Sequence, residues 1–381
     1  MMTVNLSFWE KEAFFKAVDV LIIGSGIVGL NAAIAIKERK PRYKVIVLER
    51  GVLPIGASTR NAGFACFGSM TELLDDLSNQ TADQVWALVE KRWRGLQRLR
   101  ERLGDDPIQY RPWGGYELFR PEEKATYEAC QDQMEHFNQA LSSITGLART
   151  FHNRDEDLTT FGFSGVEHLI HNQGEGQIHT GKMMAQLLAL ARDRGVEVYN
   201  GMEVAAVEEG GSGISVHLKN KWQLQADQVV VATNGFAAQL FPELAVKPAR
   251  NQVLITRPIP GLKIKGTFHY DRGFFYFRNV NDRLLLGGGR CLDIVGEETD
   301  VFGFTSLIQN NLEELLKSVI APDTPFVVDQ WWSGIMGVGQ QKVPILERLG
   351  PHLSVAVRLG GMGVAIGAQT GEEAAKLALD G

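Results

Sequence analysis

The chain is poor in cysteine, in positive charge and in long apolar runs, and each shortage excludes a class of proteins. Its three cysteines, Cys66, Cys130 and Cys291, lie far apart without a paired spacing. The sequence therefore predicts neither a disulfide framework nor a metal site. The 45 acidic residues outnumber the 39 lysines and arginines, which gives a formal net charge of −6. That balance argues against nucleic acid as a partner.

The eight histidines also lack the spacing of metal ligands, and no apolar run is long enough for a membrane span. Residues 6–16, LSFWEKEAFFK, mix aromatic with charged side chains, a pattern that fits neither a signal peptide nor a span. We expect this segment to form an N-terminal helix that packs its aromatic side chains on the body of the protein. A cytoplasmic location follows by default.

The most informative stretch is residues 18–29, VDVLIIGSGIVG. It is typical of a buried strand, a glycine turn and the start of a helix. Gly24 permits the tight turn, and Gly26 lets backbone N–H groups approach a pyrophosphate. Gly29 lets the helix pack close to the strand, and the helix N-terminus supplies partial positive charge for the phosphates.

A second apolar strand, 45–48, leads to Glu49 and Arg50. A carboxylate in this place can accept hydrogen bonds from the ribose hydroxyls of an adenosine. The glycine pattern alone is a weak signal, because glycine-rich turns are common. Together with the two strands and the acid at the expected distance, it predicts a dinucleotide-binding site. This site alone does not distinguish NAD from FAD.

Further features favour FAD. The motif lies near the start of the chain, and Glu49–Arg50 is followed by the small, hydroxyl-rich loop 56–63, GASTRNAG. That loop is long enough to run beside an extended pyrophosphate toward a flavin. Residues 360–363 precede the last helix, whose first N–H groups can point at flavin N1 and O2. The strand 229–232 ends at a small-residue turn, 233–235, where the backbone can approach a cofactor closely.

Apolar spacing and turn residues divide the rest of the chain into helices and strands. We expect helices at 71–77, 85–93, 121–144, 180–194 (with Thr180 as N-cap) and 307–320, and a last helix that follows residue 363 and runs to about 379. Short strands are expected at 114–119, 196–199, 203–208, 214–218, 223–226, 229–232 and 353–357, and longer antiparallel ones between 246 and 290.

The length of 381 residues exceeds a usual single core and predicts two domains. The expected fold class is α/β (α+β overall), with a Rossmann-like FAD-binding domain. Into it is inserted a substrate domain built on a mixed, largely antiparallel sheet with helices. We expect the FAD-binding domain to comprise 1–85, 150–240 and 325–381, and the substrate domain to comprise 86–149 and 241–324.

These motifs resemble the FAD-dependent glycine/D-amino-acid oxidase family, and most of all its gamma-glutamylputrescine oxidoreductase-like branch. The resemblance covers nearly the whole chain. Beyond the parts already described, it rests on SFW at 7–9, FYFR at 275–278, RLLLGG at 283–288, WSG at 332–334 and GGMGV at 360–364. It implies a flavoprotein that oxidises the C–N bond of an amine or amino acid by hydride transfer to flavin N5, giving an imine.

The resemblance also implies roles for single residues. The loop 58–63 would contact the pyrophosphate and the flavin, Val204 the adenine, and 361–364 the pyrimidine side of the flavin. With the motif residues, the expected cofactor contacts are Gly24, Gly26, Ile27, Gly29, Glu49, Arg50, Ser58, Thr59, Arg60, Asn61, Ala62, Gly63, Val204, Thr233, Asn234, Gly235, Gly361, Met362, Gly363 and Val364.

Four side chains are expected to line the substrate pocket: Phe64, Phe275, Trp332 and Met336. Strand alternation puts Phe275 and Phe277 on one face, and Tyr276 and Arg278 on the other. Comparison with glycine oxidase favours the face of Phe275. The alternative for each aromatic residue is a place in the apolar core.

Met336 lies where the resemblance implies an arginine that holds the substrate carboxylate. This departure favours an amine without an adjacent carboxylate, although Arg60, Arg278 and Arg290 stay open as replacements. The C-terminal region lacks the cysteine by which some relatives attach flavin, so we expect non-covalent FAD. Cys66 is expected to be a buried, inert thiol.

No pair of catalytic side chains emerges from the sequence, so we expect the flavin to carry the chemistry. Burial in an aromatic pocket would keep the substrate amine neutral. Oxygen or another acceptor would then reoxidise the flavin, the latter making the protein a dehydrogenase. The alternatives are a flavin-binding protein without amine oxidase activity, and a flavin-dependent modifier of RNA or protein. The acidic charge disfavours RNA.

Overall fold

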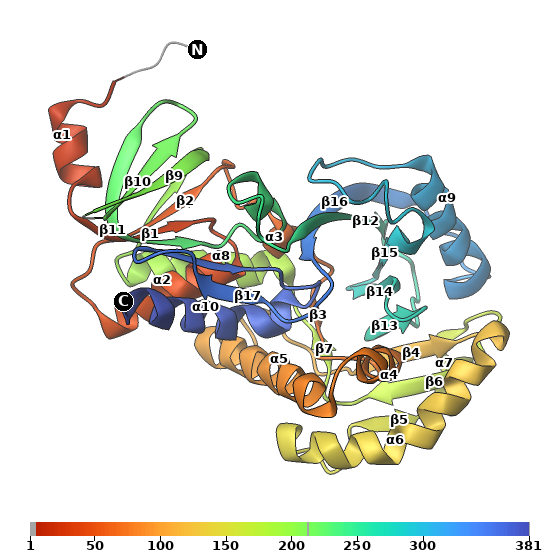
Figure 1. Cartoon of the computed structure of the whole chain (residues 1–381). Coiled ribbons are helices and arrows are strands. Elements are labelled where there is room, and N and C mark those ends of the chain that lie inside the picture. The colour runs from red at the N-terminus through yellow and green to blue at the C-terminus, as the bar shows by residue number, and fades with distance from the viewer. Residues whose placement is uncertain (1–4, 212, 381) are drawn as a thin grey trace.

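The computed structural model describes residues 5–211 and 213–380, which form two large β-sheets side by side, each covered by helices (Figure 1). The first sheet has the strand order β17-β18-β11-β1-β2-β8, and β10 and β9 extend it from β11. Its strands are β1 (Val18–Ile23), β2 (Val45–Glu49), β8 (Glu197–Asn200), β9 (Val204–Gly210), β10 (Gly213–Leu218), β11 (Gln223–Val231), β17 (Ile345–Arg348) and β18 (Leu353–Val357).

The centre of the first sheet is parallel, because β1 pairs in parallel with β11 and β2, and these pair in parallel with β18 and β8. Val20 and Ile22 of β1 face a core with helices α2 (Ile27–Arg39), α8 (Thr180–Asp193) and α10 (Gly363–Leu379). Leu21 and Ile23 face a second core that contains residues of β9, β10 and β18. Both faces are covered, which is why the strand motif is an almost unbroken apolar run.

The second sheet has the order β16-β12-β15-β14-β13-β4-β6-β5 and is antiparallel except for the β13–β4 pair. Its strands are β4 (Gly115–Phe119), β5 (Phe151–Asn153), β6 (His168–Asn172), β12 (Lys247–Thr256), β13 (Thr267–Tyr270), β14 (Phe275–Val280), β15 (Arg283–Gly288) and β16 (Val328–Val338). A separate small sheet pairs β3 (Phe64–Ala65) with β7 (Gly176–Gln177).

Helices cover the second sheet at both ends. Helices α4 (Met70–Asn79), α5 (Ala82–Leu103) and α6 (Lys124–Thr145) share an apolar core with Phe119, Phe151 and Ile170 of β4, β5 and β6. Helix α9 (Ser306–Leu315) shares another core with β12 to β15. The shorter elements are α1 (Phe8–Glu10), α3 (Ala57–Arg60), α7 (Leu158–Phe161), π-turns at Lys11–Phe15 and Leu316–Ile320, and 3-10 turns at Pro121–Glu123, Asp155–Asp157, Asn234–Gln239 and Arg290–Leu292.

The predicted elements need three corrections. His179, not Thr180, caps α8, because its Nδ1 accepts a hydrogen bond from the backbone N–H of Lys182 at 3.2 Å. The two strands expected at 223–226 and 229–232 are the single strand β11. In the N-terminal segment only Phe15 packs as expected, with its ring 5.5 Å from that of Tyr199, whereas Phe8 and Trp9 are 65% and 77% exposed.

The predicted domain boundaries stay a prediction, but strand pairing divides the chain differently at two places. The residues of β5 and β6 fall in the range 150–240 and those of β16 in 325–381, both assigned to the FAD-binding domain, yet all three strands pair in the second sheet. Apolar patterning within one strand does not indicate which sheet it joins. Residues 1–4, 212 and 381 of the predicted ranges lie outside the described residues. Over the described chain, no helix combines the length and apolarity needed to cross a membrane.

We predict that Gly29→Ala destabilises the protein by about 2 kcal/mol, because a Cβ there would lie 2.0 Å from the carbonyl oxygen of Gly24. Urea unfolding of the wild type and the variant measures this difference. The matched control is Gly181→Ala, in an exposed turn of α8, where the nearest atom to a new Cβ is 3.4 Å away. It should be neutral or stabilise by up to about 1 kcal/mol. Equal changes in the free energy of unfolding for the two variants would contradict a stabilising role for the close approach at Gly29.

Candidate active site

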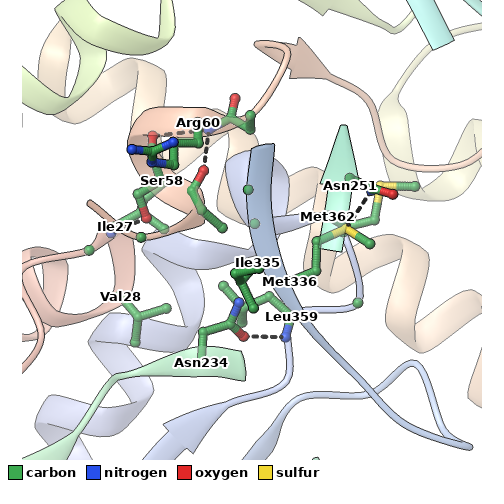
Figure 2. Close-up of a pocket in the computed structure, with 18 of the residues that line it drawn as sticks. Ile27, Val28, Ser58, Arg60, Asn234, Asn251, Ile335, Met336, Leu359 and Met362 are labelled. Atoms are coloured by element: carbon green, nitrogen blue, oxygen red, sulfur yellow. Dashed lines mark hydrogen bonds between the residues drawn. The ribbon is translucent and has the colours of Figure 1, made fainter. Parts of the chain in front are cut away.

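A cavity of about 600 Å³ lies where the two sheets meet, and both sheets contribute to its wall. From the first sheet come the ends of β1 and β2 with the start of α2, at Gly24, Glu49 and Ile27. From the second come Tyr276 of β14 and Met336 of β16. Figure 2 shows the wall, with Ser58 beside Ile27 in one part and Asn251 beside Met336 in another.

At the part of the cavity formed by the first sheet, the glycines of the dinucleotide motif let backbone segments approach one another closely. Gly24 has a φ of +106°, and a Cβ there would lie 2.8 Å from the carbonyl oxygen of Ala232. The backbone N–H of Ile27, in the first turn of α2, donates to Ser58 Oγ at 2.9 Å. The positive end of α2 therefore opens on the cavity beside the loop 56–63.

Glu49 is fixed beside this helix start. Its residue surface is 6% exposed, and its Oε2 accepts from the hydroxyl of Ser25 at 2.7 Å. Its Oε1 accepts from the backbone N–H of Gly51 at 3.0 Å. These bonds hold a carboxylate at the cavity wall, where it can also accept hydrogen bonds from a ligand.

Most residues expected to contact a cofactor line the cavity. They are Gly24, Gly26, Ile27, Glu49, Arg50, Ser58, Arg60, Asn61, Ala62, Val204, Thr233, Asn234, Gly361, Met362, Gly363 and Val364. The structure thus brings together segments from the beginning, middle and end of the chain. That these residues bind the cofactor itself remains a prediction.

Four of the residues expected to contact the cofactor do not line the cavity, because each packs or hydrogen-bonds behind its wall. Gly29 packs α2 against Gly24, and Thr59 Oγ1 turns away to donate to the carbonyl of Pro54 at 2.6 Å. At Gly63 a Cβ would lie 2.5 Å from the carbonyl oxygen of Ile178, and at Gly235 one would lie 2.2 Å from that of Met336. These glycines allow close packing of the wall rather than forming its surface.

The expected substrate pocket needs correction. Phe64 and Met336 line the cavity, but Phe275 and Trp332 do not. Phe275 belongs to the core with α9, and Tyr276, on the opposite face of β14, lines the cavity with its ring 5.7 Å from that of Phe64. Both faces of this strand carry aromatic side chains, so alternation alone does not indicate which face lines the cavity. Trp332 packs behind the wall, where its Nε1 donates to the carbonyl of Arg60 at 3.0 Å.

The three arginines left open as replacements for the missing carboxylate ligand differ in their environments. Arg60 donates to the carbonyl of Ser333 at 2.9 Å and lies 4.4 Å from the ring centroid of Phe302. Arg278 is only 5% exposed, and burial lowers its pKa to about 10. Arg290 lines the cavity, and within the described chain its guanidinium makes no hydrogen bond or ion pair.

Sequence reasoning missed several cavity residues. His269 of β13, Tyr276 and Glu72 of α4 line the wall, as do Asn251 of β12 and Lys342. Only Tyr276 left a signal, through the alternation of its strand. The others belong to no local motif, because strand pairing and helix packing bring them together from distant parts of the chain.

Glu72 is held in an ion-pair network at the edge of the cavity. Its Oε1 lies 3.1 Å from Arg92 Nη1 and 3.4 Å from Lys342 Nζ. Lys342 also lies 2.6 Å from Asp76 Oδ1. Burial opposes ionisation, but the charges of Arg92 and Lys342 outweigh it and hold the pKa of Glu72 below its ordinary value. The cavity therefore has an ionised carboxylate in its wall at neutral pH.

Cys66 also lines the cavity, with its Sγ 3.7 Å from Met362 Sδ. Burial, followed by the negative charges of Glu175 and Glu72, raises the pKa of this thiol well above its ordinary value. A protonated thiol is a poor nucleophile. Its place agrees with the expectation of a buried thiol near the flavin loop.

The family can now be read from comparison with known proteins. Residues 19–377 match the family model of FAD dependent oxidoreductases. The chain belongs to this family. A probable oxidoreductase OrdL of Rhizobium meliloti (strain 1021) is 26% identical over 378 residues, which cover 96% of this chain and 83% of that protein. Glycine oxidase of Geobacillus kaustophilus (strain HTA426) is 26% identical over 351 residues, 88% of this chain and 84% of the relative.

Solved structures of this FAD-dependent oxidoreductase family share the fold. The L-proline dehydrogenase of P. horikoshii superposes with a TM-score of 0.76 at 16% identity, covering 96% of this chain and 94% of that one. The crystal structure of the G. kaustophilus glycine oxidase gives 0.74 at 22% identity, with 95% and 94% covered. The family assignment from the motifs and the expected fold class are confirmed.

The described residues fit FAD. The cavity has an exposed helix N-terminus for phosphates and a fixed carboxylate at Glu49 for a ribose. Side chains are absent at Gly24 and Gly26, where a Cβ would come within 2.8 and 3.0 Å of its neighbours. At the far part of the cavity Gly361 and Gly363 precede and begin α10, so backbone N–H groups are accessible there as well.

We predict that Glu72→Gln destabilises the protein by about 2 kcal/mol at pH 7, since Arg92 then loses its buried charge partner. The lowered pKa of Glu72 means that this stability is present above the ordinary pKa of a glutamate and is lost as the pH falls through the lowered value. Urea unfolding at pH 7 and at pH 4 and below checks both points.

The control is Glu90→Gln, whose exposed pair with Arg94 at 2.6 Å should contribute less than about 0.5 kcal/mol. A difference between wild type and Glu72→Gln that stays constant as the pH falls would show that the carboxylate charge is not the stabilising feature.

Proposed function

We propose that this FAD-dependent oxidoreductase oxidises the C–N bond of an amine or amino acid to an imine. The observation that carries the proposal is one continuous cavity with two chemically different parts. Gly24, Ile27 and Glu49 line the part suited to a dinucleotide, and Phe64 and Tyr276 line an aromatic part beyond it. The glycine oxidase and L-proline dehydrogenase relatives, by their names, act on amino acids.

Bound FAD supplies an acceptor for the hydride at N5. We propose that FAD is held by the sixteen predicted contact residues that line the cavity. Glu49 would bind the ribose, the start of α2 the pyrophosphate, and Gly361 to Val364 the flavin. We propose non-covalent attachment, because the raised pKa keeps the Cys66 thiol protonated. A cytoplasmic location and the identity of the electron acceptor stay predictions.

The aromatic part of the cavity has the features needed to bind an amine. Phe64 and Tyr276 exclude water, and a desolvated ammonium has a lowered pKa. The ionised Glu72 in the same wall attracts a cationic substrate as it enters. The protein would thus attract the charged amine and favour its neutral form close to the flavin.

Arg290 is a suitable partner for a substrate carboxylate in this wall. The thioether of Met336 has no charge with which to bind a carboxylate. Its Sδ accepts a hydrogen bond from Asn251 Nδ2 at 3.2 Å. Arg290 lines the cavity without a competing ion pair, and burial lowers the pKa of its guanidinium without removing its charge at neutral pH. We propose that Arg290 binds the carboxylate if the substrate is an amino acid.

We predict that anaerobic mixing with glycine, L-proline, putrescine or benzylamine bleaches the flavin absorbance of the holoprotein. The purified protein should be yellow and should release FAD on denaturation. Stopped-flow absorbance at the flavin band measures the reduction. A folded holoprotein whose flavin is reduced by no amine or amino acid would favour the alternative of a flavin-binding protein without amine oxidase activity.

We predict that Arg290→Met lowers kcat/KM for carboxylate-bearing substrates by about 10- to 100-fold, the value of a charge-assisted hydrogen bond. The rate with putrescine or benzylamine should not change. The controls are Arg290→Lys, which keeps the charge, and Arg257→Met, an exposed arginine outside the cavity lining. An equal loss for amines with and without a carboxylate would exclude this role.

A further inference from the structure

We propose that His269 is the catalytic base that takes the proton from the substrate's ammonium group, and that Glu175 positions its imidazole. The inference rests on the proposed oxidation of an amine or amino acid and adds a residue to it. It starts from a histidine that the sequence did not single out, at the aromatic part of the cavity.

The first observation is the place of His269. It lies on β13 in register with Tyr276 of β14, so both side chains project from the same face of the sheet. Its ring meets that of Phe64 edge to face, with 5.1 Å between centroids. His269, Phe64 and Tyr276 all line the cavity. An amine bound against the two aromatic rings would therefore be within reach of this imidazole.

The second observation is the carboxylate behind the ring. Glu175, between β6 and β7, is 1% exposed. Its Oε1 accepts from the backbone N–H groups of Phe67 at 3.2 Å and Gly68 at 3.3 Å. Its Oε2 remains for His269, whose Nε2 is 3.8 Å away. Glu175 is thus fixed by the backbone with one oxygen toward the ring.

The two nitrogens of the imidazole have different surroundings. Nε2 is buried and has no hydrogen-bond partner within the described residues, and the Oε2 of Glu175 lies 3.8 Å from it. The 3.8 Å distance shortens to a hydrogen bond with a small shift, as happens when a ligand closes such a site. Nδ1 lies on the side of Gly273, another residue of the cavity wall, where a Cβ would be 3.9 Å from it. An Nε2–H bonded to Glu175 leaves the Nδ1 lone pair toward the cavity.

Carboxylates surround His269 from three elements. Glu175 faces it from the β6–β7 connection, Glu117 is its register partner on β4, and Glu72 belongs to α4. Tyr276 is the titratable neighbour on β14, and the cations Arg92 and Lys342 lie beyond Glu72, with which both pair. Burial opposes a positive charge on the ring, but the nearby carboxylate of Glu175, followed by Glu117 and Glu72, outweighs it and raises the pKa of His269 above its ordinary value.

The proposed step balances. The Nδ1 lone pair takes one proton from the substrate ammonium, which frees the lone pair of the substrate nitrogen and leaves an imidazolium stabilised by Glu175. Bound FAD would supply the acceptor for the electron pair of the C–H bond, which would leave as hydride while the freed nitrogen lone pair forms the C=N bond. The products are the iminium and two-electron-reduced cofactor, and the imidazolium returns its proton to solvent after product release.

The reactive form of the free enzyme has a neutral His269, which fixes the sign of the pH dependence. The second-order rate constant for flavin reduction should rise with pH through the raised pKa of His269. His269→Gln should lower this rate constant about 100-fold at neutral pH, as is typical for loss of a general base. Its remaining pH dependence should follow only the pKa of the substrate amine. Glu175→Gln should shift the acid limb to lower pH, because removal of a negative charge lowers the pKa of the histidine.

Stopped-flow reduction of the holoenzyme, with whichever of glycine, L-proline, putrescine or benzylamine reduces it fastest, measures these profiles. The control His136→Gln removes an exposed histidine of α6 and should keep the wild-type profile. NMR titration of histidine-labelled holoprotein gives a readout independent of turnover. The His269 resonance, identified by its loss in His269→Gln, should titrate above the ordinary histidine range and move lower in Glu175→Gln.

A wild-type rate and pH profile in His269→Gln would overturn the assignment of the base. An acid limb and a resonance that do not move in Glu175→Gln would overturn the positioning role. If His269→Gln does not hold FAD, the Glu175→Gln profile and titration decide the matter. Failure of every amine to reduce the wild-type flavin would instead overturn the proposed function, so the two failures are distinguishable.

Discussion

The contact between helix α2 and the turn after β1 determines where the rest of the site can lie. A Cβ at Gly29 would lie 2.0 Å from the Gly24 carbonyl oxygen, and a Cβ at Gly24 would lie 2.8 Å from that of Ala232. Three backbone segments thus touch without side chains between them. Because they do, the N-terminus of α2 reaches the cavity, and the ends of β1, β2 and β11 meet at the same edge of the sheet.

The sequence predicted the parts of the site that local spacing determines. The glycine motif, Glu49 and the loop 56–63 each depend on neighbours within a few residues, and most of their residues line the cavity. The strand 353–357 was predicted with the ends that the structure shows, and the final helix to within about one residue, because an apolar run and a glycine turn mark them. The family assignment needed no more than these local patterns.

The substrate part could not be predicted in the same way. Alternation divided β14 correctly into two faces, but only the packing of α9 decides that Phe275 is core and Tyr276 is wall. His269, Glu72 and Glu175 are far apart in the chain and meet through the pairing of β13 with β4 and through the position of α4. No pattern in a single sequence records such contacts.

The buried carboxylates of this region each have a separate source of stability. Glu72 pairs with Arg92 and Lys342, and Glu175 accepts two backbone N–H groups. Glu117 accepts from the hydroxyl of Ser69 at 3.0 Å and from the backbone N–H of Thr71 at 3.2 Å, both at the start of α4. The positive end of α4 adds to this stabilisation. These contacts offset part of the cost of burying three carboxylates behind the cavity wall, although burial still raises the pKa of Glu117 above its ordinary value.

This concentration of carboxylates creates two opposing demands on an amine substrate. The carboxylates favour the ammonium form, which lets a cation enter but cannot release a hydride, because its nitrogen has no free electron pair. The aromatic walls at Phe64 and Tyr276 favour the neutral form by desolvation, but they provide no acceptor for the proton. A group that satisfies both demands must lie at the boundary between the carboxylates and the aromatic rings and must bind a proton reversibly near neutral pH. His269 is placed at that boundary, with Phe64 on one side and Glu175 on the other.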